Sequence, residues 1–156
     1  MTFTMNEGDI FTAPRGVYFA HCISADFALG AGIAVEFQQR HGLRERLRTM
    51  MPERDLTALQ SRVGTCVLLD NVFNLITKTM CWDKPTYQDL TNSLFAMREL
   101  CAKYHINHIA MPLIGCGIDR LEWPRVESII RQVFMPTDVS IAVYYLPGKN
   151  PYGNNG

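Results

Sequence analysis

Two glycine-rich segments constrain this sequence more than any other feature. Gly30-Ala-Gly32 follows the apolar run Val17–Ile23, and Gly115-Cys-Gly117 follows the apolar run 111–114; a helical pattern comes after each segment. Glycine adopts positive φ angles and lets backbone N–H groups approach an anion closely, while the start of a helix attracts the same anion. Two such units in one chain predict a ligand that carries more than one phosphate.

Patterns along the rest of the chain predict an α/β fold. The predicted helices cover residues 32–40, 43–51, the stretch after Pro85 and the stretch around 126–133, and the predicted strands cover residues 2–5, 17–23, 63–69, 72–76, 108–113 and 139–146. The Asp70-Asn71 pair predicts a hairpin turn, and the polar stretch 52–61 is expected to be a loop. Alternating strands and helices indicate a mixed, mostly parallel sheet with helices on both faces and a ligand at the carboxyl ends of its strands.

Length and composition predict a single domain over residues 1–146 and a flexible tail over residues 147–156. The 15 basic and 15 acidic side chains leave no net charge, so the sequence lacks the basic footprint of a nucleic-acid-binding protein. We therefore expect no nucleic-acid partner.

No signal peptide or membrane-spanning stretch is evident, which predicts a cytoplasmic or nuclear protein without a membrane partner. The five cysteines are odd in number and show no C-x-x-C spacing, which argues against a disulfide framework and a zinc site. We expect neither a metal nor a cofactor.

Asp119 is the carboxylate that follows the second glycine segment. Asp119-Arg-Leu-Glu122 fits a helix capping box, and a surface salt bridge is a further ordinary role for this side chain. Pro124 argues against the cap, because it would then lie inside the helix and forfeit a backbone hydrogen bond. A helix that begins near Trp123 places Pro124 in the first turn and leaves Asp119 in a loop beside the predicted phosphate site.

Lys78 and Lys84 are the two candidate amine nucleophiles. Lys78 ends an apolar strand, where a surface lysine that keeps its ammonium in water is the ordinary interpretation. A lysine partly removed from water can instead lose its proton and attack a masked carbonyl carbon. Lys84 lies six residues later, before Pro85, and competes for this role.

Three other residues carry weaker hypotheses. His21 and Cys116 fit a Cys–His nucleophile pair, but no third orienting residue is evident, and a small thiol packed in the loop is the simpler interpretation. Trp82 is either an exposed aromatic residue that covers a sugar or a base, or an anchor for its loop.

Four motifs in order make the chain resemble the macrodomains, and more narrowly the subgroup of the terminal ADP-ribose protein glycohydrolase. The motifs are Gly8-Asp-Ile-Phe11, Ala20–Ser24 running on to Gly30–Ala34, Leu75–Lys78 followed by Lys84–Tyr87, and Met111–Leu121 with Trp123. Each glycine motif is weak alone, but the ordered set is specific and spans residues 8–146.

The resemblance implies a three-layer α/β/α fold that binds ADP-ribose, with the adenine near Asp9 and Ile10 and the diphosphate between the two glycine loops. The ligand-binding residues expected on this basis are Asp9, Ile10, His21, Ser24, Gly30, Ala31, Gly32, Ile33, Thr77, Ile114, Gly115, Cys116, Gly117, Ile118 and Leu146. In hydrolytic members of the subgroup, a lysine matching Lys78 attacks the anomeric carbon of the distal ribose, and an aspartate matching Asp119 handles the proton.

This combination implies an enzyme that releases ADP-ribose from the acidic side chains of mono-ADP-ribosylated proteins and can deacetylate O-acetyl-ADP-ribose. We expect the protein to be a monomer. The chain departs from the subgroup at Leu113, where an arginine is usual, at Pro124, and in the segment 79–83, which is less basic. Two alternatives stay open at this point: a module that binds ADP-ribose without catalysis, and a hydrolase of small ADP-ribosyl esters.

Overall fold

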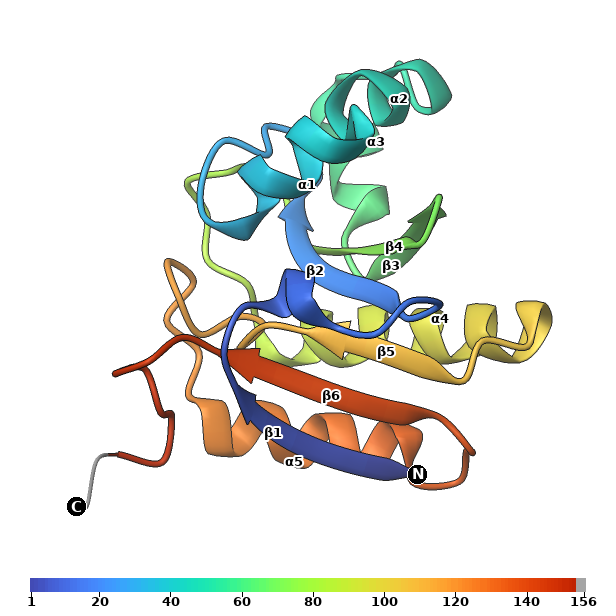
Figure 1. The fold of residues 1–156 in the computed structure, drawn as a ribbon. Helices are drawn as coiled ribbons and strands as arrows, with labels where there is room; N and C mark the ends of the chain where they lie inside the picture. The colour runs from blue at the N-terminus through green and yellow to red at the C-terminus, as the bar shows by residue number, and fades with distance from the viewer. Residues whose placement is uncertain (154–156) are drawn as a thin grey trace.

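A six-stranded mixed sheet forms the centre of the protein in a computed structural model, which describes residues 1–153 (Figure 1). The strands are β1 (Thr2–Glu7), β2 (Tyr18–Ser24), β3 (Thr65–Leu69), β4 (Val72–Lys78), β5 (His108–Met111) and β6 (Ser140–Tyr145), arranged in the order β1-β6-β5-β2-β4-β3. All neighbouring strands are parallel except β3, which is antiparallel to β4. The predicted mixed, mostly parallel sheet is confirmed.

Helices cover both faces of this sheet and complete the three-layer α/β/α fold. The helices are α1 (Ile33–His41), α2 (Leu43–Met50), α3 (Leu56–Arg62), α4 (Tyr87–Tyr104) and α5 (Trp123–Phe134), with a short 3-10 helix at Ile10–Thr12. One apolar cluster joins the sheet to α4 and α5 through buried residues such as Leu94 and Ile130. A second cluster, around Phe37 and Leu47, joins the other face to α1, α2 and α3.

The predicted hairpin is confirmed. Asp70 adopts a φ of 52° in the turn, and Leu69 pairs with Val72 in antiparallel register. Asparagine and aspartate tolerate this left-handed conformation better than most residues, which is why the Asp-Asn pair can connect the two strands. Strand β4 ends at Lys78, as expected from the apolar strand that precedes this lysine.

The prediction of a loop over residues 52–61 is wrong, because α3 begins inside this stretch at Leu56. The Asp55 carboxylate caps the helix by accepting a hydrogen bond from the Ala58 N–H at 3.0 Å. The helix buries Leu59 and the charged Arg62, whose guanidinium donates to the backbone carbonyl oxygens of three residues (Ala25, Met51 and Glu53). With a charged residue on its buried face, the helix shows no clear apolar periodicity.

Helix α5 begins as Pro124 predicts. Trp123 is its first residue, Pro124 lies in its first turn, and Glu122 occupies the N-cap position. Asp119 therefore belongs to the loop between β5 and α5 and does not cap the helix.

The segment after β6 returns to this same helix end. The Trp123 indole N–H donates to the Tyr152 hydroxyl oxygen at 3.2 Å, and the Tyr152 hydroxyl donates to the Glu127 carboxylate. The flexibility expected for residues 147–156 stays a prediction, and residues 154–156 lie outside the part of the chain that the structure describes.

Candidate functional site

A cavity of about 960 Å³ opens at the carboxyl ends of the parallel strands. Ser24 at the end of β2, Lys78 at the end of β4, Pro112 just after β5 and Tyr145 at the end of β6 all line it. Parallel strands bring their carboxyl ends to one edge of a sheet, so residues far apart in the sequence meet there. The volume lies within the usual range for small-molecule sites, which is on the order of 300–1,000 Å³.

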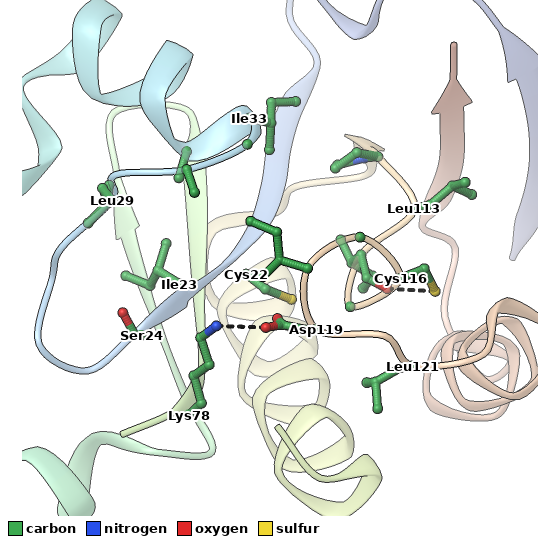
Figure 2. A pocket seen from close by; sticks show the side chains of 18 of the residues that line it. Cys22, Ile23, Ser24, Leu29, Ile33, Lys78, Leu113, Cys116, Asp119 and Leu121 are labelled. Atoms are coloured by element: carbon green, nitrogen blue, oxygen red, sulfur yellow. Dashed lines mark hydrogen bonds and ion pairs between the residues drawn. The ribbon is translucent and has the colours of Figure 1, made fainter. Parts of the chain in front are cut away.

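Lys78 and Asp119 form an ion pair in this cavity (Figure 2). The Lys78 Nζ donates to the Asp119 Oδ1 at 2.6 Å, and the two side chains are only 11% and 13% exposed. Charge-assisted hydrogen bonds of this kind are short and strong, and removal from water strengthens them further. The arrangement holds an amine and a carboxylate together at one wall of the cavity, within reach of the same bound group.

The β5–α5 loop requires glycine at its turn. Gly115 has a φ of +73°, and a Cβ added there would lie 2.9 Å from the Leu121 Cδ1. The Leu121 N–H also donates to the Gly115 carbonyl oxygen at 2.7 Å, which closes the loop behind that turn. A Cβ on Gly117 would meet no atom within 4 Å, so this loop presents open backbone toward the cavity that it lines.

The first glycine segment presents the beginning of α1 to the cavity. Gly32 is the N-cap residue with a φ of 61°, no side chain caps the helix there, and Gly32, Ile33 and Ala34 all line the cavity. The first N–H groups of a helix lack carbonyl partners within it, and together with the helix dipole they favour an anion. The two glycine segments therefore border one cavity, as the sequence predicts.

Asp26 organises the loop between β2 and α1. Its Oδ1 accepts from the Ser24 hydroxyl at 2.5 Å and from the Ala28 N–H at 3.2 Å, and its Oδ2 accepts from the Cys81 N–H at 3.0 Å. Burial raises the pKa of this carboxyl, but the hydrogen bonds outweigh burial and leave the pKa below its usual value. Asp26 thus ties Ser24 at the cavity wall to the loop that follows Lys78.

Most of the predicted site residues line the cavity. They are Ser24, Gly30, Ala31, Gly32, Ile33, Lys78, Ile114, Gly115, Cys116, Gly117, Ile118, Asp119 and Leu146. Asp9, Ile10, His21 and Thr77 do not line it, and their ligand contacts stay predictions.

The structure gives these four residues other surroundings. The Asp9 carboxylate caps the short 3-10 helix by accepting from the Phe11 N–H at 2.9 Å, while Ile10 and Thr77 are buried. His21 is completely buried, and its Nε2 lies 2.6 Å from the Asn74 Oδ1. The Asn74 amide donates to two backbone carbonyl oxygens, so its Oδ1 accepts the proton of the His21 Nε2. Burial lowers the pKa of His21 to about 4 and keeps the ring neutral.

The structure argues against a Cys–His nucleophile. Cys22 and Cys116 line the cavity, but burial, with a contribution from the Asp119 charge, raises the pKa of each thiol to about 12. The thiolate is the nucleophilic form, so such thiols are poor nucleophiles near neutral pH. His21 is engaged by Asn74 and does not line the cavity.

Sequence reasoning missed several residues of the cavity wall. Cys22, Ile23, Leu29, Leu121, Trp123, Tyr144, Tyr145, Lys149 and Pro151 also line it. Tyr144 and Tyr145 could have been identified, since they directly precede Leu146 at the end of the last predicted strand, at the edge of the sheet where the ligand was expected. Lys149 and Pro151 lie in the predicted tail and gave no signal.

Residues 1–153 contain no cluster of three or more His, Cys, Asp or Glu side chains arranged to hold a metal ion. In the same part of the chain, none of the helices combines the length and apolar character that crossing a membrane requires.

The chain is similar to known proteins in both sequence and fold. The macro domain family matches residues 21–130. The human ADP-ribose glycohydrolase OARD1 is 41% identical over 143 residues, which cover 92% of this chain and 91% of the human protein. The bovine ADP-ribose glycohydrolase OARD1 shows the same identity and coverage.

Solved structures share the fold at lower identity. The macrodomain of Mycobacterium tuberculosis DarG is 19% identical with a TM-score of 0.78, covering 92% of this chain and 97% of that one. Thermosipho africanus DarTG, solved in complex with ADP-ribose, is 17% identical with a TM-score of 0.75, covering 96% of this chain and 42% of that one. On the family match, the identity to OARD1 and the fold, this chain belongs to the macro domain family.

Proposed function

We propose that this protein binds ADP-ribose in the cavity and hydrolyses the ester that links ADP-ribose to glutamate or aspartate side chains. The observation that carries the proposal is the Lys78–Asp119 pair at 2.6 Å, in a cavity of fitting size that both glycine loops also line. The 41% identity to OARD1, an ADP-ribose glycohydrolase, supports the same reaction class.

The diphosphate is expected between the N-terminus of α1 and the β5–α5 loop. Both segments line the cavity with backbone at glycine positions, where N–H groups can approach phosphate oxygens without interference from a side chain. The distal ribose then lies toward Lys78 and Asp119. Its anomeric carbon carries the ester to the modified protein and is the electrophile of the reaction.

Lys78 acts as the nucleophile and Asp119 as the acid/base. Asp119 takes a proton from the Lys78 ammonium, and the freed amine forms a bond to the anomeric carbon while the bond to the glutamyl oxygen breaks. The glutamate leaves as a carboxylate, which requires no metal because a carboxylate is a good leaving group. Asp119 passes the proton that it took to solvent and then deprotonates a water molecule, which displaces the neutral Lys78 amine from the anomeric carbon. Asp119 returns this second proton to Lys78 as ADP-ribose is released, and the ion pair is restored. The same site would accept O-acetyl-ADP-ribose as a small ester substrate.

The test measures release of free ADP-ribose from a protein mono-ADP-ribosylated on glutamate. The wild type, Lys78→Ala, Asp119→Ala and the control Lys103→Ala, at an exposed site on α4, are compared, and ADP-ribose binding is measured for each by calorimetry. We expect release by the wild type and the control, and loss of release in both site variants with binding retained.

Two outcomes would contradict parts of this proposal. Binding without release by the wild type would leave a module that recognises ADP-ribose and does not hydrolyse its esters. Release that survives in Lys78→Ala would exclude the lysine mechanism while leaving the activity in place.

A further inference from the structure

Lys84 competes with Lys78 for the role of nucleophile in the sequence, and the structure separates the two. The Lys78 Nζ contacts the Asp119 carboxylate, whereas the Lys84 Nζ donates to the backbone carbonyl oxygen of Ile118 at 2.6 Å. Lys78 lines the cavity and Lys84 does not. Lys84 therefore contacts the residue directly before Asp119 and stays outside the space where a substrate would react.

The tip of the β5–α5 loop, residues 116–120, has few contacts that fix it. Within the loop, the Arg120 N–H donates to the Gly117 carbonyl oxygen at 3.1 Å, and Arg120 itself has a φ of 60°. Ile118 is 58% exposed, so packing of its side chain does not anchor the tip. Among the described residues 1–153, two hydrogen bonds reach the tip from outside the loop, one from Lys78 and one from Lys84.

The two residues after Lys84 restrict the conformation of the backbone from which its side chain extends. Lys84 precedes the buried Pro85, which restricts its backbone to extended conformations, and Thr86 then caps α4 by accepting from the Asp89 N–H at 3.0 Å. An ammonium held at this point bonds to a carbonyl one residue from the acid. Without it, the pair between Lys78 and Asp119 would be the remaining outside bond to the tip.

We propose that Lys84 is a positioning residue, which holds the Ile118 carbonyl and thereby keeps the Asp119 carboxylate against Lys78. This inference rests on the proposed function for its kinetic consequence, but the contact itself does not depend on catalysis. Misplacing an acid/base by about 1 Å can cost on the order of a hundredfold in rate. Because Lys84 is exposed, we expect a loss of about tenfold when its hydrogen bond is removed.

The test compares Lys84→Met, which keeps the apolar stem, with Lys84→Arg, which keeps a donor for the Ile118 carbonyl. Lys103→Met is the matched control at an exposed lysine on α4. We expect Lys84→Met to lower kcat for ADP-ribose release about tenfold, with KM and the Kd for ADP-ribose changed less than twofold. Lys84→Arg restores most of the rate, and Lys103→Met leaves it unchanged.

Hydrogen exchange of the Arg120 amide gives a second readout that requires no turnover. We expect faster exchange at Arg120 in Lys84→Met than in the wild type, and wild-type exchange in Lys84→Arg and Lys103→Met. This result supports the positioning role even if the wild type proves not to be a hydrolase.

Three results would overturn the proposal. Unchanged kcat and unchanged exchange in Lys84→Met would show that the contact has no effect on the loop. Complete loss of activity in both Lys84→Met and Lys84→Arg would indicate a nucleophile. A loss of rate matched by an equal rise in the Kd for ADP-ribose would indicate a ligand contact.

Discussion

Ser24 and Lys78 lie opposite each other on β2 and β4, directly after a shift in register that skips Thr77. Ile23 pairs with Ile76, but Ser24 pairs with Lys78, so β4 contains one extra residue at this point. Such irregularities change the direction of the side chains that follow them and occur often beside active sites. Here the shift places Lys78 level with Ser24 at the cavity edge, while Thr77 stays buried.

Replacing Lys78 with arginine separates charge from nucleophilicity. An arginine keeps a positive charge and can bond to Asp119, but its guanidinium does not lose a proton near neutral pH and so cannot attack. We expect Lys78→Arg to release ADP-ribose at least about a thousandfold more slowly than the wild type. The Kd for ADP-ribose, measured by calorimetry, should change less than about threefold. Substantial release by this variant would show that Lys78 acts through its charge alone.

Substitution of Gly115 should be costly for two separable reasons. Gly115→Ala would be strained by its positive φ and by the contact of the new Cβ with Leu121. Gly16 also has a positive φ, of +86°, but a Cβ added there would meet no atom within 4 Å, so Gly16→Ala carries only the first kind of strain. We expect Gly16→Ala to lower the free energy of unfolding by about 1 kcal/mol and Gly115→Ala by about 3 kcal/mol.

A double-mutant cycle in chemical denaturation isolates the steric part of this cost. In a Leu121→Ala background, Gly115→Ala should cost only about 1 kcal/mol, because the contacting Cδ1 is absent. An equal cost in both backgrounds would show that Leu121 does not restrict this position.

The stability of the protein should fall as the pH decreases from about 6.5 to about 4. The pKa of His21 is about 4 in the folded protein and 6.5 as its model value, so in this window the unfolded chain binds a proton that the folded protein does not. The stabilisation is complete above pH 6.5 and is lost as the pH falls toward 4, with an upper bound of about 3 kcal/mol.

Urea unfolding at several pH values tests this in the wild type and in His21→Gln, whose amide can still donate to Asn74. Above pH 6.5, the free energies of unfolding of the two proteins should depend on pH in the same way. Below pH 6.5, that of the wild type should fall more steeply than that of His21→Gln. Parallel pH profiles would contradict the assignment of this effect to His21.

Asp26 should matter more for stability than the serine that it binds. Asp26→Ala removes an acceptor for three donors, which belong to Ser24, Ala28 and Cys81, while Ser24→Ala removes one of those contacts. We expect Asp26→Ala to lower the free energy of unfolding by about 2 kcal/mol and Ser24→Ala by about 1 kcal/mol or less, measured by urea titration at neutral pH. Equal effects would show that the backbone contacts to Ala28 and Cys81 add no stability.

Local chemistry made much of the fold predictable from the sequence. The Asp70-Asn71 turn and Pro124 each act on their immediate neighbours, and the hairpin and the start of α5 follow from them. Helix α3 was missed because its buried face includes Arg62, whose partners are backbone carbonyl oxygens in other segments. The spacing of apolar residues, from which helices are predicted, does not reveal that a charged side chain will be buried by such hydrogen bonds.

Most of the predicted site residues line one cavity, but the geometry of that cavity could not be predicted from the sequence. The resemblance identified Lys78 and Asp119, but they are 41 residues apart, and their contact depends on the strand order and on the register shift beside Thr77. The role of Lys84 could not be decided from the sequence. Lys78 and Lys84 both follow the same strand closely, and only their hydrogen-bond partners show which of them contacts Asp119.

The contact of Tyr152 with Trp123 and Glu127 connects the segment after β6 to the beginning of α5. Trp123 lines the cavity, as do Lys149 and Pro151 in the segment that Tyr152 fastens. A ligand that binds better when this segment is docked must in turn favour docking by the same free energy. Ligand binding in the cavity should therefore protect residues 147–153 against proteases, although none of these residues takes part in the proposed reaction.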